Sequence, residues 1–252
     1  MHRKEPTQPD GFSLPFGGSE PVGYLAMNLL LLGQGKTGSL VSGVASERHH
    51  HIRVLRSADN PRGSALTGDN LREVDVVIDF TSPSSVMDNI AGCARAGKNL
   101  VVGTTGWYEQ MDKARELVAS SGIGMVFAAN FSVGVNLFFE IARTASAALK
   151  QRYFGQIFER HHVHKKDAPS GTALTLQRVI KDASGQELEI VSFREGDVVG
   201  MHEIVLDSLN DSIYLCHDAK SRRGFAEGAV RAAEWIAGRK GFYDFKDVWR
   251  EL

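Results

Sequence analysis

Short apolar runs alternate with longer amphipathic segments through the first half of the chain. Strand patterns occur at residues 28–32, 52–55, 75–80, 99–102 and 124–128, and helix-like segments between them end near residues 46, 96 and 121. Repeated strand–helix units predict a parallel sheet. Ligands of such sheets bind beyond the carboxyl ends of the strands, so the residues after each strand are the first candidates for function.

The first strand is followed at once by a glycine-rich sequence, Gly33-Gln34-Gly35-Lys36-Thr37-Gly38. With a strand before it and a helix-like segment after it, this sequence fits the Gly-x-Gly-x-x-Gly fingerprint of dinucleotide binding. Gly33 permits the tight turn, Gly35 lets a pyrophosphate approach the backbone, and Gly38 allows close helix packing. The pyrophosphate would lie at the helix N-terminus, where free N–H groups and the dipole favour anions.

The end of the second strand, where such folds contact the ribose, reads Leu55-Arg56-Ser57. An NAD-selective site would place Asp or Glu there, but the nearest acid is Asp59. Arg56 and the Ser57 hydroxyl suit a 2′-phosphate, so the sequence favours NADPH. The alternative, with Arg56 as a surface cation and Asp59 turned back to the ribose, leaves NADH open.

Small and polar residues also follow three later strands, at 79–82, 103–105 and 128–131. Because the carboxyl ends of parallel strands share one edge of a sheet, we expect these segments to converge with the glycine-rich loop on one cleft. The alternative is that each is only a turn at a strand end.

The second half contains a dense group of histidines and cations within residues 159–173, Glu-Arg-His-His-Val-His-Lys-Lys-Asp-Ala-Pro-Ser-Gly-Thr-Ala. Residues 153–159 alternate like a strand, and Pro169-Ser170 is a typical helix start. We therefore expect the group on a strand-to-helix loop, where scaffolds commonly carry chemistry. Asp167 is expected to act as a turn and N-cap residue.

Two side chains of this group are candidates for acid–base chemistry. The His161 imidazole titrates near neutrality, and the Lys165 ammonium is a proton donor. Ser170, Gly171 and Thr172 open the next helix, where backbone N–H groups and the Thr hydroxyl suit a carboxylate.

No metal site is predicted from the histidines. His49, His50 and His51 precede the second strand without a companion cysteine or carboxylate cluster, so an exposed surface is expected. The histidines at 161, 162 and 164 lie on an extended segment, which directs neighbouring side chains to opposite sides.

Composition narrows the partners and the compartment. The 252 residues suffice for two modest domains, and the net charge of −1 gives no reason to expect nucleic acid or an anionic membrane as main partner. The longest apolar run, residues 29–32, is too short to span a bilayer. Two cysteines make no disulfide framework, which favours a cytoplasmic location. Residues 1–26, rich in Pro, Gly and Ser, are expected to be a disordered extension.

Five motifs in order resemble one family. They lie at residues 33–38, 79–81, 103–106, 129–136 and 161–173, and they resemble 4-hydroxy-tetrahydrodipicolinate reductase (dihydrodipicolinate reductase) over residues 27–250. The resemblance implies an α/β fold: a Rossmann-type parallel-sheet domain at 27–132, completed by a helix at 222–252, and a C-terminal α+β domain with a mixed sheet at 133–221. It also implies a homotetramer and NAD(P)H-dependent reduction of 4-hydroxy-tetrahydrodipicolinate to tetrahydrodipicolinate, in the diaminopimelate route of lysine biosynthesis.

The resemblance also implies roles for individual residues. His161 would be the proton donor or acceptor and Lys165 the proton donor, while His162, Ser170, Gly171 and Thr172 would contact the substrate. The nicotinamide end would be held by residues after the fourth and fifth strands: Gly103, Thr104, Thr105, Ala128, Ala129, Asn130 and Phe131. The chain departs from the family in its N-terminal extension, in the missing acid after the second strand, and in a shortened stretch between residues 193–196 and 205, where the family's longer loop is missing.

Two other functions are compatible with a dinucleotide fold. A semialdehyde dehydrogenase of similar plan needs a nucleophilic cysteine at a helix start, but Cys93 lies inside a helix pattern and Cys216 inside a strand. A non-catalytic NADP-binding sensor has no use for His161 and Lys165 beside a dicarboxylate site, and a related imine reductase remains a further alternative.

Overall fold

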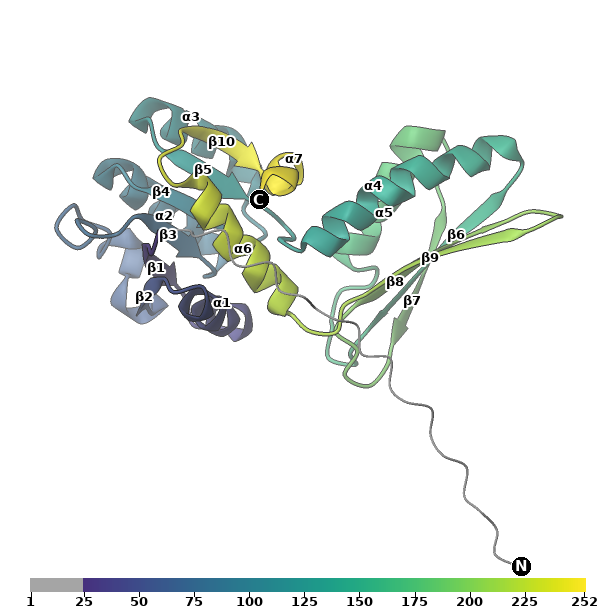
Figure 1. Cartoon of the computed structure of the whole chain (residues 1–252), viewed down its shortest axis with the longest axis horizontal. Helices are drawn as coiled ribbons and strands as arrows, with labels where there is room; N and C mark the ends of the chain where they lie inside the picture. The colour runs from purple at the N-terminus through teal and green to yellow at the C-terminus, as the bar shows by residue number, and fades with distance from the viewer. Residues whose placement is uncertain (1–24) are drawn as a thin grey trace, which may run out of the picture.

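The computed structural model describes residues 25–252, which form two sheets with separate sets of helices (Figure 1). Nearly all of the segment expected to be an extension, residues 1–26, lies outside the described residues. The first sheet is wholly parallel, in the order β10-β5-β4-β3-β1-β2. Its strands are β1 (Asn28–Leu32), β2 (His51–Leu55), β3 (Val76–Asp79), β4 (Asn99–Val102), β5 (Gly124–Phe127) and β10 (Gly241–Asp244).

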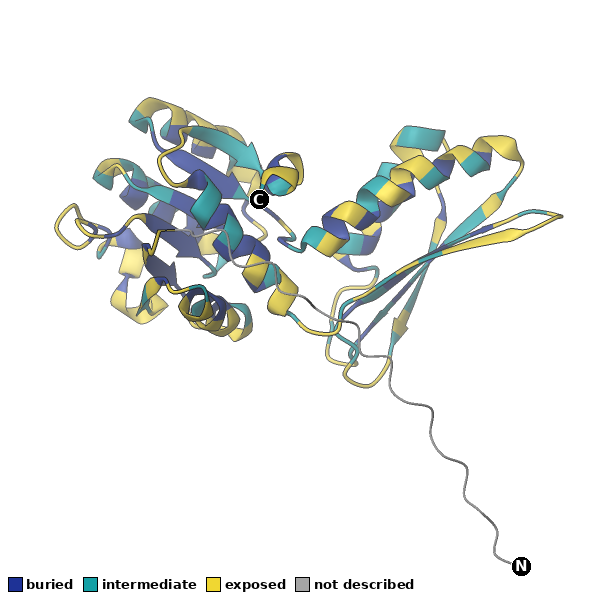
Figure 2. Ribbon diagram, viewed as in Figure 1, coloured by how far each residue is buried: buried dark blue, intermediate teal, exposed yellow. Residues whose placement is uncertain are grey.

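Helices cover both faces of this sheet. One face packs against α1 (Lys36–Glu47) and α6 (Arg223–Ile236), and the other against α2 (Pro83–Ala96) and α3 (Met111–Ser121). The leucines of β1 alternate between the two cores, because successive side chains of a strand point to opposite faces. This double coverage explains why the inner strands β1, β3 and β4 read as nearly continuous apolar runs, and Figure 2 shows these strands largely buried.

The second sheet is mixed, in the order β7-β6-β8-β9. Its strands are β6 (Phe154–His161), β7 (Glu189–Arg194), β8 (Met201–Asp207) and β9 (Ser212–Asp218), and only β6 and β7 run parallel. The helices α4 (Val133–Ala145) and α5 (Gly171–Ser184) pack on one face, over Ile157 of β6 and Ile204 of β8. The opposite face carries exposed aromatic residues, among them Phe154 and Tyr214.

The remaining elements are short. A helical turn, α7 (Phe245–Val248), follows β10. Short 3₁₀ segments lie at Ser57–Asp59, Pro61–Gly63, Tyr108–Gln110, Ser146–Gln151 and Trp249–Glu251. In the part of the chain that the structure describes, no helix combines the length and apolarity needed to cross a membrane.

The predicted strands and helices of the first half are confirmed, with ends that differ by one residue or two. Two expectations were wrong in detail. Strand β6 continues to His161, so this histidine ends a strand rather than lying on the loop. Residues 222–252 are not a single helix: α6 ends at Ile236, and after the left-handed Gly238 the chain adds the edge strand β10.

Candidate active site

The glycine-rich loop lies directly against the ends of β2 and β3. The Gly33 N–H donates to the Leu55 carbonyl at 3.0 Å, and its φ of +92° is a conformation that favours glycine. A Cβ at Gly33 would lie 2.2 Å from the Phe80 carbonyl oxygen. These contacts place Arg56, the next residue after Leu55, beside the loop that is expected to hold a pyrophosphate.

A buried carboxylate ties together the ends of β3 and β4. Asp79 is fully buried, and its oxygens accept hydrogen bonds from the hydroxyls of Thr81 and Thr104 at 2.7 and 2.9 Å and from Asn89 Nδ2 at 2.8 Å. Burial raises the pKa of Asp79, and these hydrogen bonds lower it by less. The Thr104 hydroxyl is therefore used to hold the loop, whereas the neighbouring Thr105 is exposed.

The segment after β5 connects the two halves of the molecule. The Phe131 ring packs against Phe80 and Phe245, with centroids 6.4 and 4.8 Å apart. Asn130 Oδ1 accepts the Ser132 N–H at 2.9 Å, and Asn130 Nδ2 lies 3.5 Å from the Thr172 hydroxyl. A predicted cofactor residue and a predicted substrate residue are thus in contact.

The remaining predicted cofactor residues are open to a ligand. Ala128 is buried and supports the loop, but the residues that could contact a dinucleotide through side chain or backbone are largely exposed: Gln34, Gly35, Lys36, Arg56 and Ala129. Thr37 and Gly103 are half-buried, and a Cβ at buried Gly38 would lie 2.7 Å from the Gly33 carbonyl oxygen.

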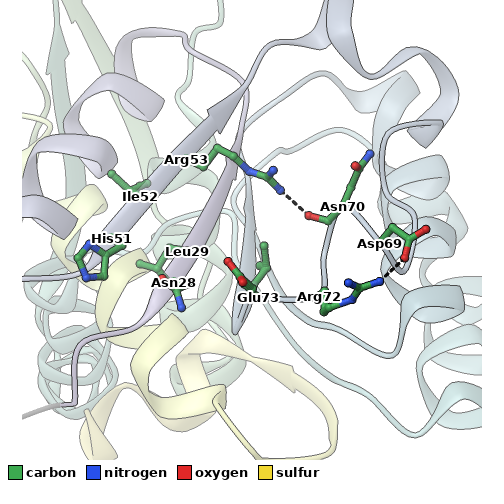
Figure 3. Close-up of a pocket in the computed structure, with 10 residues that line it drawn as sticks. Asn28, Leu29, His51, Ile52, Arg53, Asp69, Asn70, Arg72 and Glu73 are labelled. Carbon is green, nitrogen blue, oxygen red and sulfur yellow. Dashed lines mark hydrogen bonds and ion pairs between the residues drawn. The ribbon is translucent and has the colours of Figure 1, made fainter.

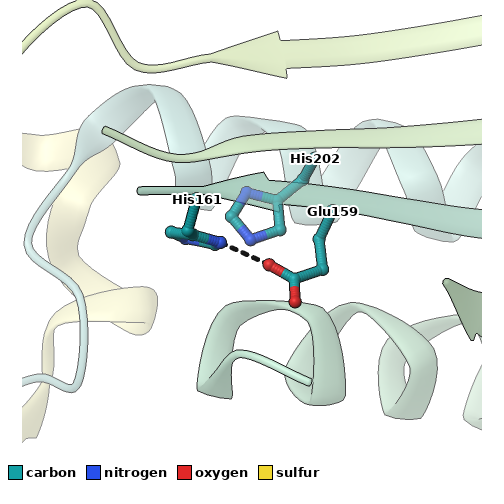
Figure 4. A group of neighbouring side chains, drawn as sticks. All are labelled: Glu159, His161 and His202. Atoms are coloured by element: carbon teal, nitrogen blue, oxygen red, sulfur yellow. Dashed lines mark hydrogen bonds and ion pairs between the residues drawn. The ribbon is translucent and has the colours of Figure 1, made fainter. Parts of the chain in front are cut away.

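His161 lies at the end of β6 within a buried polar group (Figure 4). Its Nδ1 is hydrogen-bonded to one carboxylate oxygen of Glu159, and the other oxygen accepts Arg194 Nη2 at 2.8 Å. The His202 ring stands edge-on to His161, with centroids 5.2 Å apart. Three residues of this group were not predicted from the sequence as parts of the site: Glu159, Arg194 and His202.

The charge state of this group follows from its burial. Burial lowers the pKa of His161, and the adjacent Glu159 carboxylate opposes that shift. Burial would raise the pKa of Glu159, but hydrogen bonds and positive neighbours, Arg194 first, bring it below its usual value. Burial and the nearby His161 lower the pKa of His202 to about 4, so this ring is neutral at neutral pH.

The loop after β6 holds the second acid–base candidate. Lys165 Nζ is paired with the Asp167 carboxylate, and this hydrogen bond lowers the pKa of Asp167. Arg194 Nη2 also donates to the Asp167 carbonyl at 2.5 Å. The expectation that Asp167 caps the next helix was wrong, since Ser170 is the N-cap and accepts the Ala173 N–H at 3.1 Å.

The substrate-binding candidates lie around the start of α5. The N–H groups of Gly171 and Thr172 belong to its first turn, where a helix offers no acceptor of its own. The Ser170 hydroxyl is buried and lies 3.1 Å from His202 Nε2. His162 Nε2 lies 3.2 Å from Arg222 Nη2, and its pKa is lowered by desolvation and then by Arg222, with a smaller effect of Lys36. His162 is therefore close to cations of two segments, Arg222 before α6 and Lys36 of the glycine-rich loop.

Another histidine, His50, departs from its expected exposed surface. It is buried; its Nδ1 accepts the Met27 N–H at 3.2 Å, and its Nε2 lies 2.7 Å from Glu234 of α6. The resemblance implied that a helix in 222–252 returns to the first domain, but not that Glu234 on it pairs with His50. Glu159, His161 and His202 also have ligand atoms within 4.8 Å of one another, but both oxygens of Glu159 already accept hydrogen bonds.

A cavity of about 410 Å³ lies elsewhere, at the opposite end of the first sheet (Figure 3). It is lined by the beginnings of β1 and β2 and by the loop before β3, with cations such as Arg53 beside acids such as Glu73. None of the predicted site residues lines it.

Comparison with known proteins decides the family. A model described as "Dihydrodipicolinate reductase, N-terminus" matches residues 27–131, and one described as "Dihydrodipicolinate reductase, C-terminus" matches residues 134–249. The chain belongs to the dihydrodipicolinate reductase family. The predicted resemblance is confirmed, and the α/β fold with it.

Relatives of this reductase family agree along most of the chain. A 4-hydroxy-tetrahydrodipicolinate reductase of Christiangramia forsetii is 37% identical over 240 residues, covering 90% of this chain and 99% of the relative. One from Chromobacterium violaceum is 41% identical over 195 residues, covering 69% and 73%. Among solved structures, a dipicolinate-bound dihydrodipicolinate reductase from Paenisporosarcina sp. TG-14 has a TM-score of 0.72 at 22% identity, covering 89% of this chain and all of that one.

Proposed function

We propose that this protein reduces 4-hydroxy-tetrahydrodipicolinate to tetrahydrodipicolinate with NAD(P)H, in the diaminopimelate route of lysine biosynthesis. The observation that carries the proposal is the contact between Asn130 and Thr172. It joins a strand end of the dinucleotide fold to the helix start that follows the histidine-rich loop. Family membership and the curated relatives support the same activity.

The residues present fit a dinucleotide. Gly33 and Gly38 leave the backbone open where a Cβ would collide, and the N-terminus of α1 is exposed. A bound NAD(P)H supplies the hydride for the reduction. Lys36 and the backbone of residues 33–38 would hold its pyrophosphate, and residues 103–105 and 128–131 would orient its nicotinamide end.

Substrate binding and proton transfer would fall to residues of the histidine-rich loop and the start of α5. The first-turn N–H groups of α5 and the Thr172 hydroxyl would bind one substrate carboxylate, with His162 also in contact. His161 and Lys165 would handle the proton that must reach the ring atom where negative charge accumulates. Loss of water from the hydroxylated precursor leaves a ring C=C bond conjugated with the ring C=N bond. This C=C bond takes up one hydride and one proton, and the product keeps its C=N bond.

Arg56 leads us to favour NADPH over NADH. It is exposed, it follows Leu55 beside the glycine-rich loop, and no acid replaces it at the strand end. A guanidinium at this position suits a 2′-phosphate. We further propose a cytoplasmic location, as expected for the pathway, and a division into residues 27–132 with 222–252 and residues 133–221.

We propose that the chain assembles as a homotetramer through the open face of the second sheet. This face contains a hollow of about 920 Å³ among β6, β7, β8 and β9, with Phe154 79% and Tyr214 66% exposed. Exposed aromatic residues on an uncovered sheet face are typical of an interface between protein chains.

The first experiment is to follow oxidation of NADPH and NADH separately, with substrate generated in situ by a dihydrodipicolinate synthase from pyruvate and aspartate semialdehyde. Turnover that requires the synthase supports the reductase, and the ratio of the two cofactors tests the role of Arg56. Cofactor binding without synthase-dependent turnover would instead support the NADP-binding sensor.

The semialdehyde dehydrogenase alternative requires an activated thiol. Cys93 is fully buried in α2, where burial raises its pKa, and the pKa of Cys216 in β9 is also raised. A raised pKa disfavours the thiolate form that a nucleophilic cysteine needs, at both positions. Alkylation of the accessible thiol should leave turnover unchanged, and loss of activity in proportion to its labelling would favour that alternative.

A further inference from the structure

The buried carboxylate next to His161 has no role in the proposed mechanism so far. We propose that Glu159 is a positioning residue: with Arg194 it holds the His161 imidazole in one orientation, with Nδ1 engaged and Nε2 left for the reacting group. This inference rests on the proposed function for its catalytic consequence, but the geometry of the pair stands by itself.

The strand geometry brings the two side chains together. Glu159 and His161 are two residues apart on β6, so both point to the face that α4 and α5 cover. Ile157 points the same way and belongs to the core of that face. Glu159 is consequently 0% exposed, and a buried carboxylate is costly unless it is hydrogen-bonded and paired.

Arg194 fixes the carboxylate from the neighbouring strand. It is the register partner of His161 on β7, and its Nη2 donates both to Glu159 and to the Asp167 carbonyl. Glu159 therefore has one oxygen for Arg194 and one for His161. The same guanidinium links this group to the residue that pairs with Lys165, so it spans both acid–base candidates.

The hydrogen bond to Glu159 determines which ring nitrogen of neutral His161 carries the proton. A neutral imidazole that donates from Nδ1 to a carboxylate has an unprotonated Nε2, which can accept a proton and then return it. Gly200 provides the space beside this nitrogen, since a Cβ there would lie 2.9 Å from His161 Nε2. The carboxylate also stabilises the imidazolium that forms.

The pKa of the His161 imidazole depends on its burial and on the charged groups around it. Glu159 favours the protonated ring, whereas burial, Lys165 and Arg194 disfavour it. His202 from β8 stands edge-on to the His161 ring and stays neutral. Removing the charge of Glu159 alone should thus lower the pKa of His161.

The test is Glu159→Gln in the full chain, with Glu195→Gln as the matched control. Glu195 follows Arg194 and pairs with Arg160 at the surface. Two measurements are made: ¹⁵N NMR of the His161 ring across a pH titration, and kcat and KM across pH. We expect Glu159→Gln to lower kcat about 10- to 100-fold, as loss of an orienting partner does elsewhere, with little change in the KM for NADPH.

The ring itself should report the change directly. Its pKa should fall, because the Glu159 charge that favours the protonated ring is gone, and the neutral form should lose its strong preference for Nδ1–H. Glu195→Gln should behave like the wild type in both measurements. An unaltered His161 titration in Glu159→Gln would overturn the proposal.

A second variant changes the surroundings of the other ring nitrogen, His161 Nε2. Gly200→Ala adds a methyl group against Nε2 and should lower kcat while leaving Glu159 in place. If Glu159→Gln does not fold, wild-type turnover in Gly200→Ala would overturn the proposal. If no protein turns over the substrate, the proposed function fails, while the NMR titration still decides the role of Glu159.

Discussion

The Lys165 ammonium forms a two-pronged ion pair with the Asp167 carboxylate, with Nζ 2.8 and 2.9 Å from its two oxygens. The two residues lie on the same loop, and the Asp167 side chain is 59% exposed. An ion pair so open to water contributes little to stability. Its structural effect is to direct the ammonium group along the loop that leads to α5.

Replacing Lys165 with alanine should affect turnover far more than cofactor binding. General acid catalysis contributes about 10²- to 10⁴-fold, so we expect kcat to fall by at least about 100-fold in Lys165→Ala. The dissociation constant of NADPH, measured by fluorescence, should change less than about threefold. Lys166→Ala, on the exposed next residue, is the control. Equal losses in turnover and NADPH binding would contradict the role of Lys165.

Replacing Arg56 tests the cofactor preference. A charge-assisted hydrogen bond to the 2′-phosphate is worth roughly 1.5–3 kcal/mol, so Arg56→Ala should raise the KM for NADPH by about 10- to 100-fold. NADH lacks this phosphate, and its KM should stay nearly constant. Arg53→Ala is the control: it removes a nearby cation, on β2, whose guanidinium donates to the Asn70 carbonyl. Parallel loss of both cofactors in Arg56→Ala would show that Arg56 supports the loop instead.

Two glycines of α1 provide a matched pair for the dinucleotide loop. A Cβ at Gly38 would collide with the Gly33 carbonyl oxygen at 2.7 Å, whereas one at Gly43 meets nothing within 4 Å. Gly38→Ala should cost roughly 1–3 kcal/mol in the free energy of unfolding and weaken NADPH binding. Gly43→Ala should stabilise the helix by roughly 0.5–1 kcal/mol and leave binding unchanged. Urea unfolding and NADPH titration of both variants decide this, and equal NADPH affinity in the two would contradict it.

The first half was predictable because its strands are buried on both faces and end in recognisable turns. Each apolar run in β1, β3 and β4 carries its own boundary signal, such as Gly33 or Pro83. The second sheet is covered on one face only, and β9 is mostly exposed, so its strands have no comparable apolar signature.

The candidate site was predictable where it is continuous in sequence, from His161 to Thr172. Glu159 could have been found as well, because an acid two residues before a histidine on a strand shares its face. Arg194 and His202 could not, since they reach the site through strand register: Arg194 opposite His161, and His202 opposite Glu159. Register depends on the packed sheet and not on local sequence.

Acid should destabilise the protein partly through His202. Its pKa in the folded protein, about 4, lies below the usual 6.5, so the unfolded chain binds the proton first as pH falls. The contribution of neutral His202 to the free energy of unfolding is therefore fully present above about pH 6.5, and it is lost as the pH falls from there toward 4. At about pH 4.5 the loss from this ring alone should be roughly 2–3 kcal/mol, at 1.36 kcal/mol per pKa unit.

His202→Gln isolates this contribution because glutamine keeps a polar group near Ser170 but does not titrate. The variant should be less stable than the wild type at about pH 7, since packing against His161 is lost. Between about pH 7 and about pH 4.5, the free energy of unfolding should fall less in the variant than in the wild type, by roughly 2–3 kcal/mol. Urea unfolding at both pH values, at one protein concentration, measures the difference, with exposed His49→Gln as the control. An identical acid-induced loss in the wild type and His202→Gln would show that Glu159 and the other carboxylates alone set the acid limit.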